Sequence, residues 1–161
     1  MAFSDKEIAS AIEMGELKIL PRGFRLNPAG VDLRIDRGVR LKPKQQLLVA
    51  SIERVELSNR IVGFLHLRSS LAREGLFASL ALVDPGFRGQ LTVSLYNSGD
   101  SAVNLAKGER FIQLSLLRLG KPSTKKYAGR YQNSSGVVAS RRRKRSHTPK
   151  IMESVIQGTG G

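Results

Sequence analysis

The sequence has no cysteine among its 161 residues and only two histidines. The absence of cysteine excludes a disulfide framework, a thiolate zinc site and a cysteine nucleophile. His66 and His147 stand far apart in the sequence, so we expect no histidine-rich metal site. No stretch approaches the roughly 20 apolar residues that span a bilayer, and the N-terminus has no apolar signal-peptide core. We therefore expect a cytoplasmic protein with no membrane partner.

Acidic residues are also scarce, since 13 Asp and Glu stand against 27 Lys and Arg, which gives a formal net charge of +14. Residues 141–161 contain six of the basic residues and one of the acidic ones. The preceding 140 residues contain the other 21 and 12, so they are basic as well. A basic body indicates an anionic partner, either a nucleic acid or a small polyphosphate. Charge alone does not choose between the two.

Patterns along the chain predict one short helix followed by strands. Ser4 and Glu7 form a capping-box pattern before a short apolar stripe, and Gly15 is a typical helix stop. Short alternating or apolar runs, bounded by turn residues, then predict strands. They lie at 31–35, 47–50, 61–65, 91–96 and 111–116. Short strands at such regular spacing predict an all-β fold, either a barrel or a jelly roll.

The length suits one domain with one hydrophobic core. The segment beyond Tyr127 is rich in Ser, Arg and Gly and too poor in apolar residues to add a layer to that core. We therefore predict a β-barrel domain over residues 1–126, an arm over 127–140, and a basic, disordered tail over 141–161.

The first candidate site is the segment Arg-Ser-Ser-Leu-Ala-Arg at 68–73, which follows an apolar strand. Arg68, Ser69, Ser70 and Arg73 supply two guanidiniums and two hydroxyls at a strand end, where free backbone N–H groups also converge. A polyphosphate requires such donors. The same composition is also typical of a surface turn with solvated arginines, and composition alone favours that alternative.

The second candidate lies in residues 82–90, where two apolar runs flank a turn with Asp84, Pro85 and two glycines. This pattern predicts a β-hairpin. Asp84 ends the apolar run 80–83, and a carboxylate in such surroundings can be desolvated enough to act as a base toward water. The alternative is an aspartate that only starts the turn by accepting hydrogen bonds from its own backbone.

Two further residues follow the same reasoning. Gln113 lies on a predicted strand after the turn 107–110, where its amide could donate to phosphate or simply face solvent. Asp32 lies on the predicted strand 31–35 and could hold a water-coordinated cation or pair with an arginine. The residues alone leave both alternatives open.

These segments also carry a resemblance to a known family. AGVDLR (29–34), RSSLAR (68–73), VDPGFRG (83–89), LYNSG (95–99) and GERFIQ (108–113) follow one another in this order. Together they resemble the ordered motifs of the dUTPase/dCTP deaminase superfamily. The resemblance implies a distorted jelly-roll β-barrel that assembles as a homotrimer, with active sites between subunits.

The resemblance also implies a role for each candidate residue. The expected ligands of the substrate triphosphate all carry hydrogen-bond donors, and they are Arg68, Ser69, Ser70, Arg73 and Gln113. The backbone of the 80–95 hairpin would hold the pyrimidine, and Phe87 would stack beneath the deoxyribose. Asp84 would activate the attacking water. Asp32 would orient waters around Mg²⁺, which the triphosphate and water would mainly hold.

Within the superfamily, two reactions remain open. Zinc-free deamination of dCTP depends on a glutamate ten residues after the motif aspartate, and this chain has Ser94 at that position. A serine cannot shuttle protons near neutral pH. We therefore expect hydrolysis of dUTP to dUMP and pyrophosphate. The alternative is dCTP deamination, alone or combined with the hydrolysis.

The C-terminal segment departs from the classical hydrolases, which close the site with a glycine-rich, arginine-bearing motif. Residues 127–136 resemble the closing arm of the deaminases instead, and Tyr127, Arg130 and Gln132 are its expected substrate contacts. Five consecutive cations at 141–145 raise a last alternative, a non-catalytic nucleotide or nucleic-acid binder. Such runs are usually solvated and bind without sequence preference, so we expect no specific nucleic-acid partner.

Overall fold

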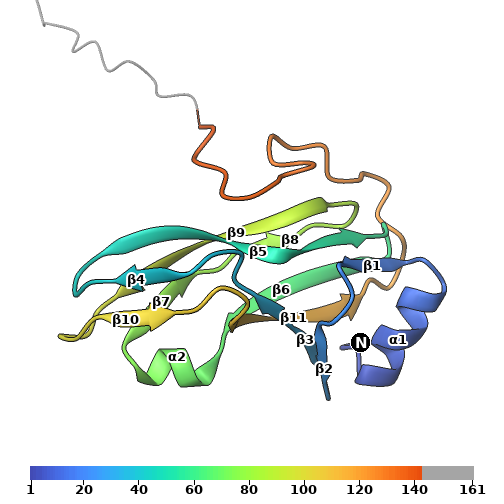
Figure 1. Cartoon of the computed structure of the whole chain (residues 1–161). Coiled ribbons are helices and arrows are strands. Elements are labelled where there is room, and N and C mark those ends of the chain that lie inside the picture. The colour runs from blue at the N-terminus through green and yellow to red at the C-terminus, as the bar shows by residue number, and fades with distance from the viewer. Residues whose placement is uncertain (143–161) are drawn as a thin grey trace, which may run out of the picture.

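The computed structural model describes residues 1–142, in which an N-terminal helix precedes a set of antiparallel strands (Figure 1). The helices are α1 (Asp5–Glu13) and α2 (Ser69–Arg73). The strands are β1 (Leu17–Leu20), β2 (Arg25–Asn27), β3 (Gly30–Arg34), β4 (Val39–Leu41), β5 (Gln46–Leu57), β6 (Ile61–Leu67), β7 (Leu76–Ser79), β8 (Leu82–Val83), β9 (Arg88–Asn97), β10 (Val103–Leu105) and β11 (Arg110–Arg118). The predicted all-β fold is confirmed. The predicted tail lies outside the described residues from position 143 onward.

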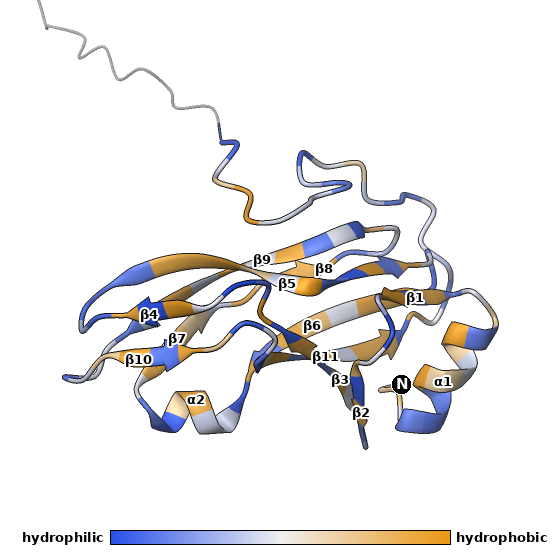
Figure 2. Cartoon of the chain, in the orientation of Figure 1, coloured by the Kyte–Doolittle hydropathy of each residue, from blue (hydrophilic) through white to orange (hydrophobic). Residues whose placement is uncertain are grey.

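The hydrophobic core lies between two antiparallel sheets with strand orders β1-β5-β9-β7 and β2-β3-β11-β6-β8, and β4 and β10 form a separate pair. Alternation of buried residues along strands such as β6 and β9 contributes much of this core. In β9, Leu91, Val93 and Leu95 are buried, whereas the residues between them face outward. Figure 2 shows the same alternation of apolar and polar positions along the ribbons. A strand with this alternation presents one face to the core and leaves the other for a site or an interface.

The N-terminal helix forms as its sequence predicts. The backbone N–H of Ser4 donates to Glu7 Oε2 at 2.8 Å, and Ser4 Oγ accepts from the Glu7 N–H at 3.4 Å. The bond from the Ser4 backbone holds the pKa of Glu7 below its ordinary value. Ile8 and Ala11 are buried, and Gly15 takes the left-handed conformation (φ 71°) that ends the helix. Neither helix in residues 1–142 is long and apolar enough to cross a membrane.

The predicted hairpin over residues 82–90 is wrong. β8 pairs with β6 in one sheet, whereas β9 pairs with β5 and β7 in the other. The turn between them exists, because the Phe87 N–H donates to the Asp84 carbonyl at 3.0 Å and Gly86 has a φ of 84°. It carries the chain from one sheet to the other. Two apolar runs around a turn indicate a change of direction, but they do not indicate which strand each run will pair with.

A buried ion pair joins the two sheets. Glu53 of β5 is fully buried, and its carboxylate accepts from Arg34 Nε at 2.6 Å and from the Arg34 backbone N–H at 2.8 Å. One residue thus satisfies both oxygens, which is the condition for a buried carboxylate to be tolerated. The pair fixes β3 relative to β5, and β3 also carries Asp32.

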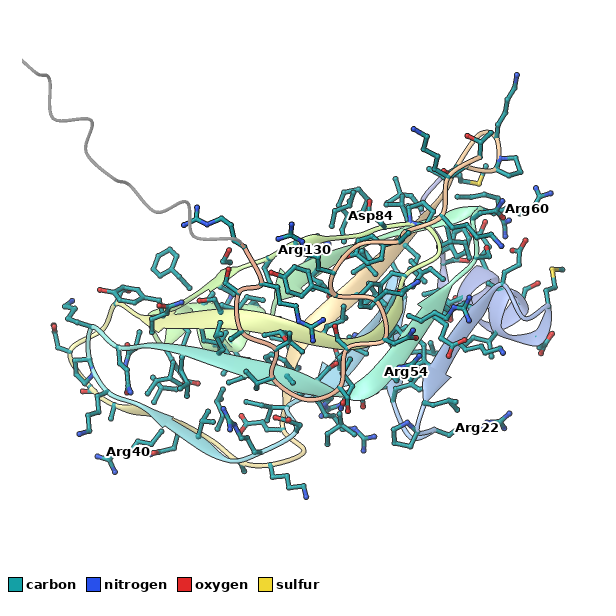
Figure 3. The ribbon with its side chains drawn as sticks, turned by 90° about the horizontal axis from the view of Figure 1, so that it is seen from above. Arg22, Arg40, Arg54, Arg60, Asp84 and Arg130 are labelled. Carbon is teal, nitrogen blue, oxygen red and sulfur yellow. The ribbon has the colours of Figure 1, made fainter. Side chains whose placement is uncertain are left out.

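Residues 119–142 run back across the outer side of β9 and β5 (Figures 1 and 3). The Asn133 N–H donates to the Arg88 carbonyl at 2.7 Å, and the Gln90 N–H donates to the Ser134 carbonyl at 2.9 Å. Further along, the Val138 N–H donates to Thr92 Oγ1 at 3.1 Å. We call residues 119–142 the arm. These hydrogen bonds hold it along the first half of β9 of its own chain.

Candidate active site

A polar cleft of about 400 Å³ lies on the outer face of the five-stranded sheet. It contains four of the residues that the sequence singles out, namely Asp32, Arg68, Ser69 and Gln113. Arg25, Asn27, Pro28 and Leu67 complete its lining. The structure thus brings together residues from three separate motifs.

Strand register explains why these residues meet. Asp32 of β3 lies opposite Arg25 of β2 on one side and opposite Gln113 of β11 on the other. Gln113 lies opposite His66 of β6 in turn. Because cross-strand partners project from the same face of a sheet, the four side chains form one polar row across four strands. The row ends beside Arg68, which follows β6 directly.

Asp32 is the acidic residue of this cleft, and only 3% of it is exposed. Its Oδ1 accepts a hydrogen bond from Asn27 Nδ2 at 2.7 Å. Gly30 allows the neighbouring Gln113 to lie close to the backbone of β3. A Cβ at position 30 would stand 2.8 Å from Gln113 Nε2 and 2.9 Å from the Leu114 carbonyl oxygen. A side chain there would displace Gln113 from the cleft.

The segment at 68–73 forms the short helix α2, which Leu71 anchors to the core. The Arg68 N–H donates to the Phe111 carbonyl at 3.1 Å, which fixes the end of β6 against the start of β11. Ser69 opens the helix, and no side chain caps it. Ser69, Ser70 and Arg73 are all exposed, but only Ser69 of these three lines the cleft.

Asp84 lies in a different place. It follows β8, where Val83 is paired with Gly63 of β6, whereas the cleft begins at the other end of β6, at Leu67. At about 3.3 Å per residue, Gly63 and Leu67 are about 13 Å apart along the strand. Asp84 is partly buried, and no described residue donates a hydrogen bond to its carboxylate, so it does not cap its own turn.

The arm packs against the turn that carries Asp84 (Figure 3). The Tyr127 N–H donates to the Pro85 carbonyl at 2.8 Å, and the Tyr127 ring meets the Phe87 ring edge-on at 5.6 Å. Gln132 accepts from the Arg88 N–H at 2.8 Å and donates to the Gly86 carbonyl at 2.9 Å. Two of the three predicted arm residues therefore contact the Asp84 turn directly, and Phe87 is only 8% exposed beneath them.

Arg130, the third predicted arm residue, makes its described hydrogen bond elsewhere. Its Nη1 donates to the Arg141 carbonyl at 2.7 Å, and the Arg141 guanidinium donates to the Arg130 carbonyl in return. Arg130 therefore links two parts of the arm, and its side chain makes no described hydrogen bond to the Asp84 turn.

Ser94 lies on the outer face of β9, beyond the part that the arm covers. Its hydroxyl accepts from Gln46 Nε2 at 2.7 Å, and its cross-strand partners are Leu48 and Ser79. Both partners are neutral. Ser94 therefore has no carboxylate among its register neighbours that could take over a proton shuttle.

Sequence reasoning missed Arg25, Asn27 and the position of His66. Arg25 and Asn27 flank Leu26 in a three-residue strand that was too short and too polar to be recognised. The alternation of polar residues immediately before the 29–34 motif was the available signal. No group of three or more His, Cys, Asp or Glu residues suited to a metal ion occurs in the part of the chain that the structure describes.

Comparisons with known proteins identify the family of the chain. The dCTP deaminase-like family model matches residues 35–119. A dCTP deaminase of Thermococcus kodakarensis is 41% identical over 134 residues, covering 74% of this chain and 86% of that protein. A probable deoxyuridine 5'-triphosphate nucleotidohydrolase of Sulfolobus islandicus rod-shaped virus 1 is 37% identical over 154 residues, covering 86% and 97%.

Solved structures match at the level of the fold. The dUTPase of Staphylococcus bacteriophage 80alpha superposes with a TM-score of 0.60 at 20% identity, covering 71% of this chain and 97% of that one. The sequence relatives are thus named either for deamination or for hydrolysis. The solved dUTPase structure shares the fold of this chain. The chain is an enzyme of the dUTPase/dCTP deaminase superfamily.

Proposed function

We propose that this enzyme is a dUTP diphosphatase, which hydrolyses dUTP to dUMP and pyrophosphate. Asp84 takes a proton from a water molecule whose oxygen attacks the α-phosphorus. The bond between the α-phosphorus and the bridging oxygen breaks, and pyrophosphate leaves with the bonding electrons. The Asp84 carboxylate suits this role because it is partly buried and no described residue uses it as an acceptor.

Ser94 is the observation that carries the choice of reaction. Deamination of cytosine needs a group that moves protons between the attacking water and the leaving ammonia. Ser94 and its neighbours Gln46 and Ser79 have no group that titrates near neutral pH. Hydrolysis of dUTP makes no such demand on this position, because its reacting atom is the phosphorus.

In this proposal, the residues that line the polar cleft bind the triphosphate. Arg68, Ser69 and Gln113 offer guanidinium, hydroxyl and amide donors to phosphate oxygens. Arg25 adds a second guanidinium within the same lining. Ser70 and Arg73, on the exposed side of α2, would contact the outer end of the triphosphate. Positive charge at this place stabilises the negative charge that builds up as pyrophosphate leaves.

Magnesium fits this site only in an indirect way. Asp32 is the one carboxylate in the lining of the cleft, and Asn27 already uses one of its oxygens. A hard cation needs more oxygen ligands than that, so the triphosphate and water would supply most of them and Asp32 would orient a water. When bound, the ion would supply charge neutralisation on the phosphate oxygens.

The turn and the arm form the nucleoside side of the proposed site. The backbone around Gly86 and Arg88 would hold the pyrimidine, and Phe87 would lie against the deoxyribose. Tyr127 and Gln132 hold that turn by hydrogen bonds and ring contact, so they would fix the wall against which the sugar packs. A tight wall at this place would reject the 2'-hydroxyl of a ribonucleotide.

Assembly would complete the site. The Asp84 turn and the triphosphate cleft lie at opposite ends of β6 within one chain, about 13 Å apart along the strand. A homotrimer that places the Asp84 turn of one copy over the cleft of the next would join them. The homotrimer belongs to this proposal because it gives the separated residues a common substrate.

Two assays on the purified chain test the function. Pyrophosphate release should be fast with dUTP and slow with UTP, dTTP and dCTP in the presence of Mg²⁺. Ammonia release from dCTP should not exceed the background without enzyme. Efficient conversion of dCTP to dUTP or dUMP would show that another group shuttles protons and that the enzyme is a deaminase, alone or combined with the hydrolase.

A further inference from the structure

Positive charge is concentrated at the C-terminal end of the described chain. Residues 119–142 contain six Lys or Arg and no Asp or Glu. The basic residues are Lys121, Lys125, Lys126, Arg130, Arg141 and Arg142. All six are exposed, and none takes part in an ion pair within residues 1–142. We call these six residues the cationic arm. The sequence continues with four more basic residues up to Lys150.

Arg54 of β5 donates to Asn133 Oδ1 at 2.9 Å, and the other hydrogen bonds between the arm and the barrel join neutral groups. The described hydrogen bonds to the Asp84 turn and β9 come from the side chains of Gln132 and Ser135 and from the backbones of Tyr127, Asn133, Ser134, Gly136 and Val138. The cations of the arm make none of these bonds. Their charge is therefore not needed for the arm to dock, and six like charges without counter-charges raise the free energy of the folded chain.

Two of the cations are held together. Arg130 and Arg141 each donate a guanidinium hydrogen bond to the carbonyl of the other, which places two exposed like charges on one short stretch of the arm. Each guanidinium keeps further N–H donors for an outside acceptor. Such an arrangement is relieved by an anion that contacts both groups.

We propose that the cationic arm binds nucleic acid without sequence preference, through the phosphates of a polynucleotide. The six charges are spread over a segment of 24 residues, which matches a chain of phosphates better than one compact anion. The described arm is mostly polar in Figure 2, and Tyr131, at 37% exposure, is its most exposed large apolar side chain. These features favour a polynucleotide over a lipid surface, which would need apolar anchors.

Fluorescence anisotropy with a labelled 20-base-pair DNA of mixed sequence, using the full-length protein, tests this proposal. The test variant replaces Lys121, Lys125, Lys126 and Arg142 by Gln, and it leaves Arg130 and Arg141 in place. The matched control replaces four exposed cations outside the arm, Arg22, Arg40, Lys42 and Lys107, by Gln. Figure 3 shows Arg22 and Arg40 away from the arm.

The wild-type protein should bind the duplex, and its affinity should fall about 10³-fold between 50 and 200 mM salt. The test variant should bind at least tenfold more weakly, with a salt slope smaller by up to about 3.6, or 0.9 for each lost cation. The control variant should lose clearly less. Equal losses in the two variants, or no binding by the wild-type protein, would overturn the proposal.

Two further readings separate this proposal from the enzymatic one. The test variant should release pyrophosphate from dUTP at the wild-type rate, because none of its four positions belongs to the proposed site. Saturating dUTP should leave DNA binding in place. Full competition by dUTP would assign the anion affinity to the substrate site, and binding to phosphatidylserine vesicles but not to DNA would assign it to membranes. Either result would refute the proposal.

Discussion

The two halves of the proposed site lie near opposite ends of β6 and are built in different ways. At the cleft end, side chains from neighbouring strands converge, and the register of the sheet sets their spacing. At the other end, the Asp84 turn joins the two sheets, and backbone and amide hydrogen bonds from the arm hold it. The cleft is therefore as rigid as the sheet, whereas the geometry of the turn depends on a segment more than 40 residues later in the chain.

The two regions also differ in charge, and this difference suits them to different steps of the proposed reaction. The cleft combines Arg25 and Arg68 with one acidic residue, so it suits an anion that must be held in place. The turn combines one partly buried carboxylate with apolar rings, so it suits a base that must face a neutral sugar and a water. Neither half performs the proposed hydrolysis by itself. The following predictions either break this division or make it sharper.

The largest expected effect comes from removing the base. Asp84→Asn preserves the shape of the side chain and the hydrogen bonds of the turn, which use the Asp84 backbone. Turnover of dUTP should fall by about 10²–10⁴-fold, with little change in nucleotide affinity. Steady-state pyrophosphate release and equilibrium binding of a non-hydrolysable dUTP analogue measure the two quantities. Near-normal turnover would remove Asp84 from its proposed role.

Mixing subunits tests whether the halves come from different copies. Arg68→Ala and Asp84→Asn should each lower activity by at least about 10²-fold on their own. When the two variants are unfolded together in equal amounts and refolded, about a quarter of the sites should receive both intact residues. Activity should then rise to about a quarter of the wild-type value. Activity that stays at the level of the single variants would place both residues in one copy, contrary to the proposed assembly.

Truncation separates the arm from the residues that follow it. A chain that ends before Tyr127 loses the ring contact with Phe87 and the hydrogen bonds of Gln132, so the Asp84 turn should loosen and turnover should fall. The barrel should still fold, because the buried cluster consists of residues before position 119. A chain that ends after Arg145 should keep its activity. Circular dichroism checks folding in both, and the opposite pattern of activities would contradict the role given to the arm.

Much of the fold could be predicted from local patterns. The capping box of Ser4 and Glu7 and the alternation along β9 are local signals, and both formed as expected. The pairing of β8 was not local, because Val83 packs against Gly63, where the lack of a side chain makes room for it. Nothing in residues 82–90 themselves encodes that partner. A hairpin was therefore the natural expectation, and it was wrong.

The composition of the candidate site also depends on strand pairing that the local sequence does not specify. Asp32, Arg68, Ser69 and Gln113 could be chosen one by one as chemically capable residues, but their meeting in one cleft depends on the order β2-β3-β11-β6. Arg25 lines the cleft because β2 lies next to β3 in that order, which places Arg25 opposite Asp32. The docking of Gln132 on the Asp84 turn also depends on the path of the arm, which composition cannot specify.

The smallest expected effect concerns Gly30, which tests how tightly the cleft is built. A methyl group at this position would stand 2.8 Å from the Gln113 amide and 2.9 Å from the backbone oxygen of Leu114. The amide can move, but the backbone of β11 cannot move without disturbing its pairing with β3. Gly30→Ala should therefore lower the free energy of unfolding by about 1–3 kcal/mol and raise the KM for dUTP more than it lowers kcat.

Gly120→Ala is the matched control, because no atom lies within 4 Å of a Cβ built at that position. It should leave the free energy of unfolding and the KM within experimental error of the wild-type values. Denaturant titrations and dUTP saturation curves on both variants give the comparison. If Gly30→Ala kept the wild-type KM while losing stability, Gln113 would have no part in holding the substrate, and the cleft would consist of Arg25, Arg68 and Ser69 around Asp32. If both variants behaved as the wild type, the close approach of β3 to Gln113 would not constrain the site at all.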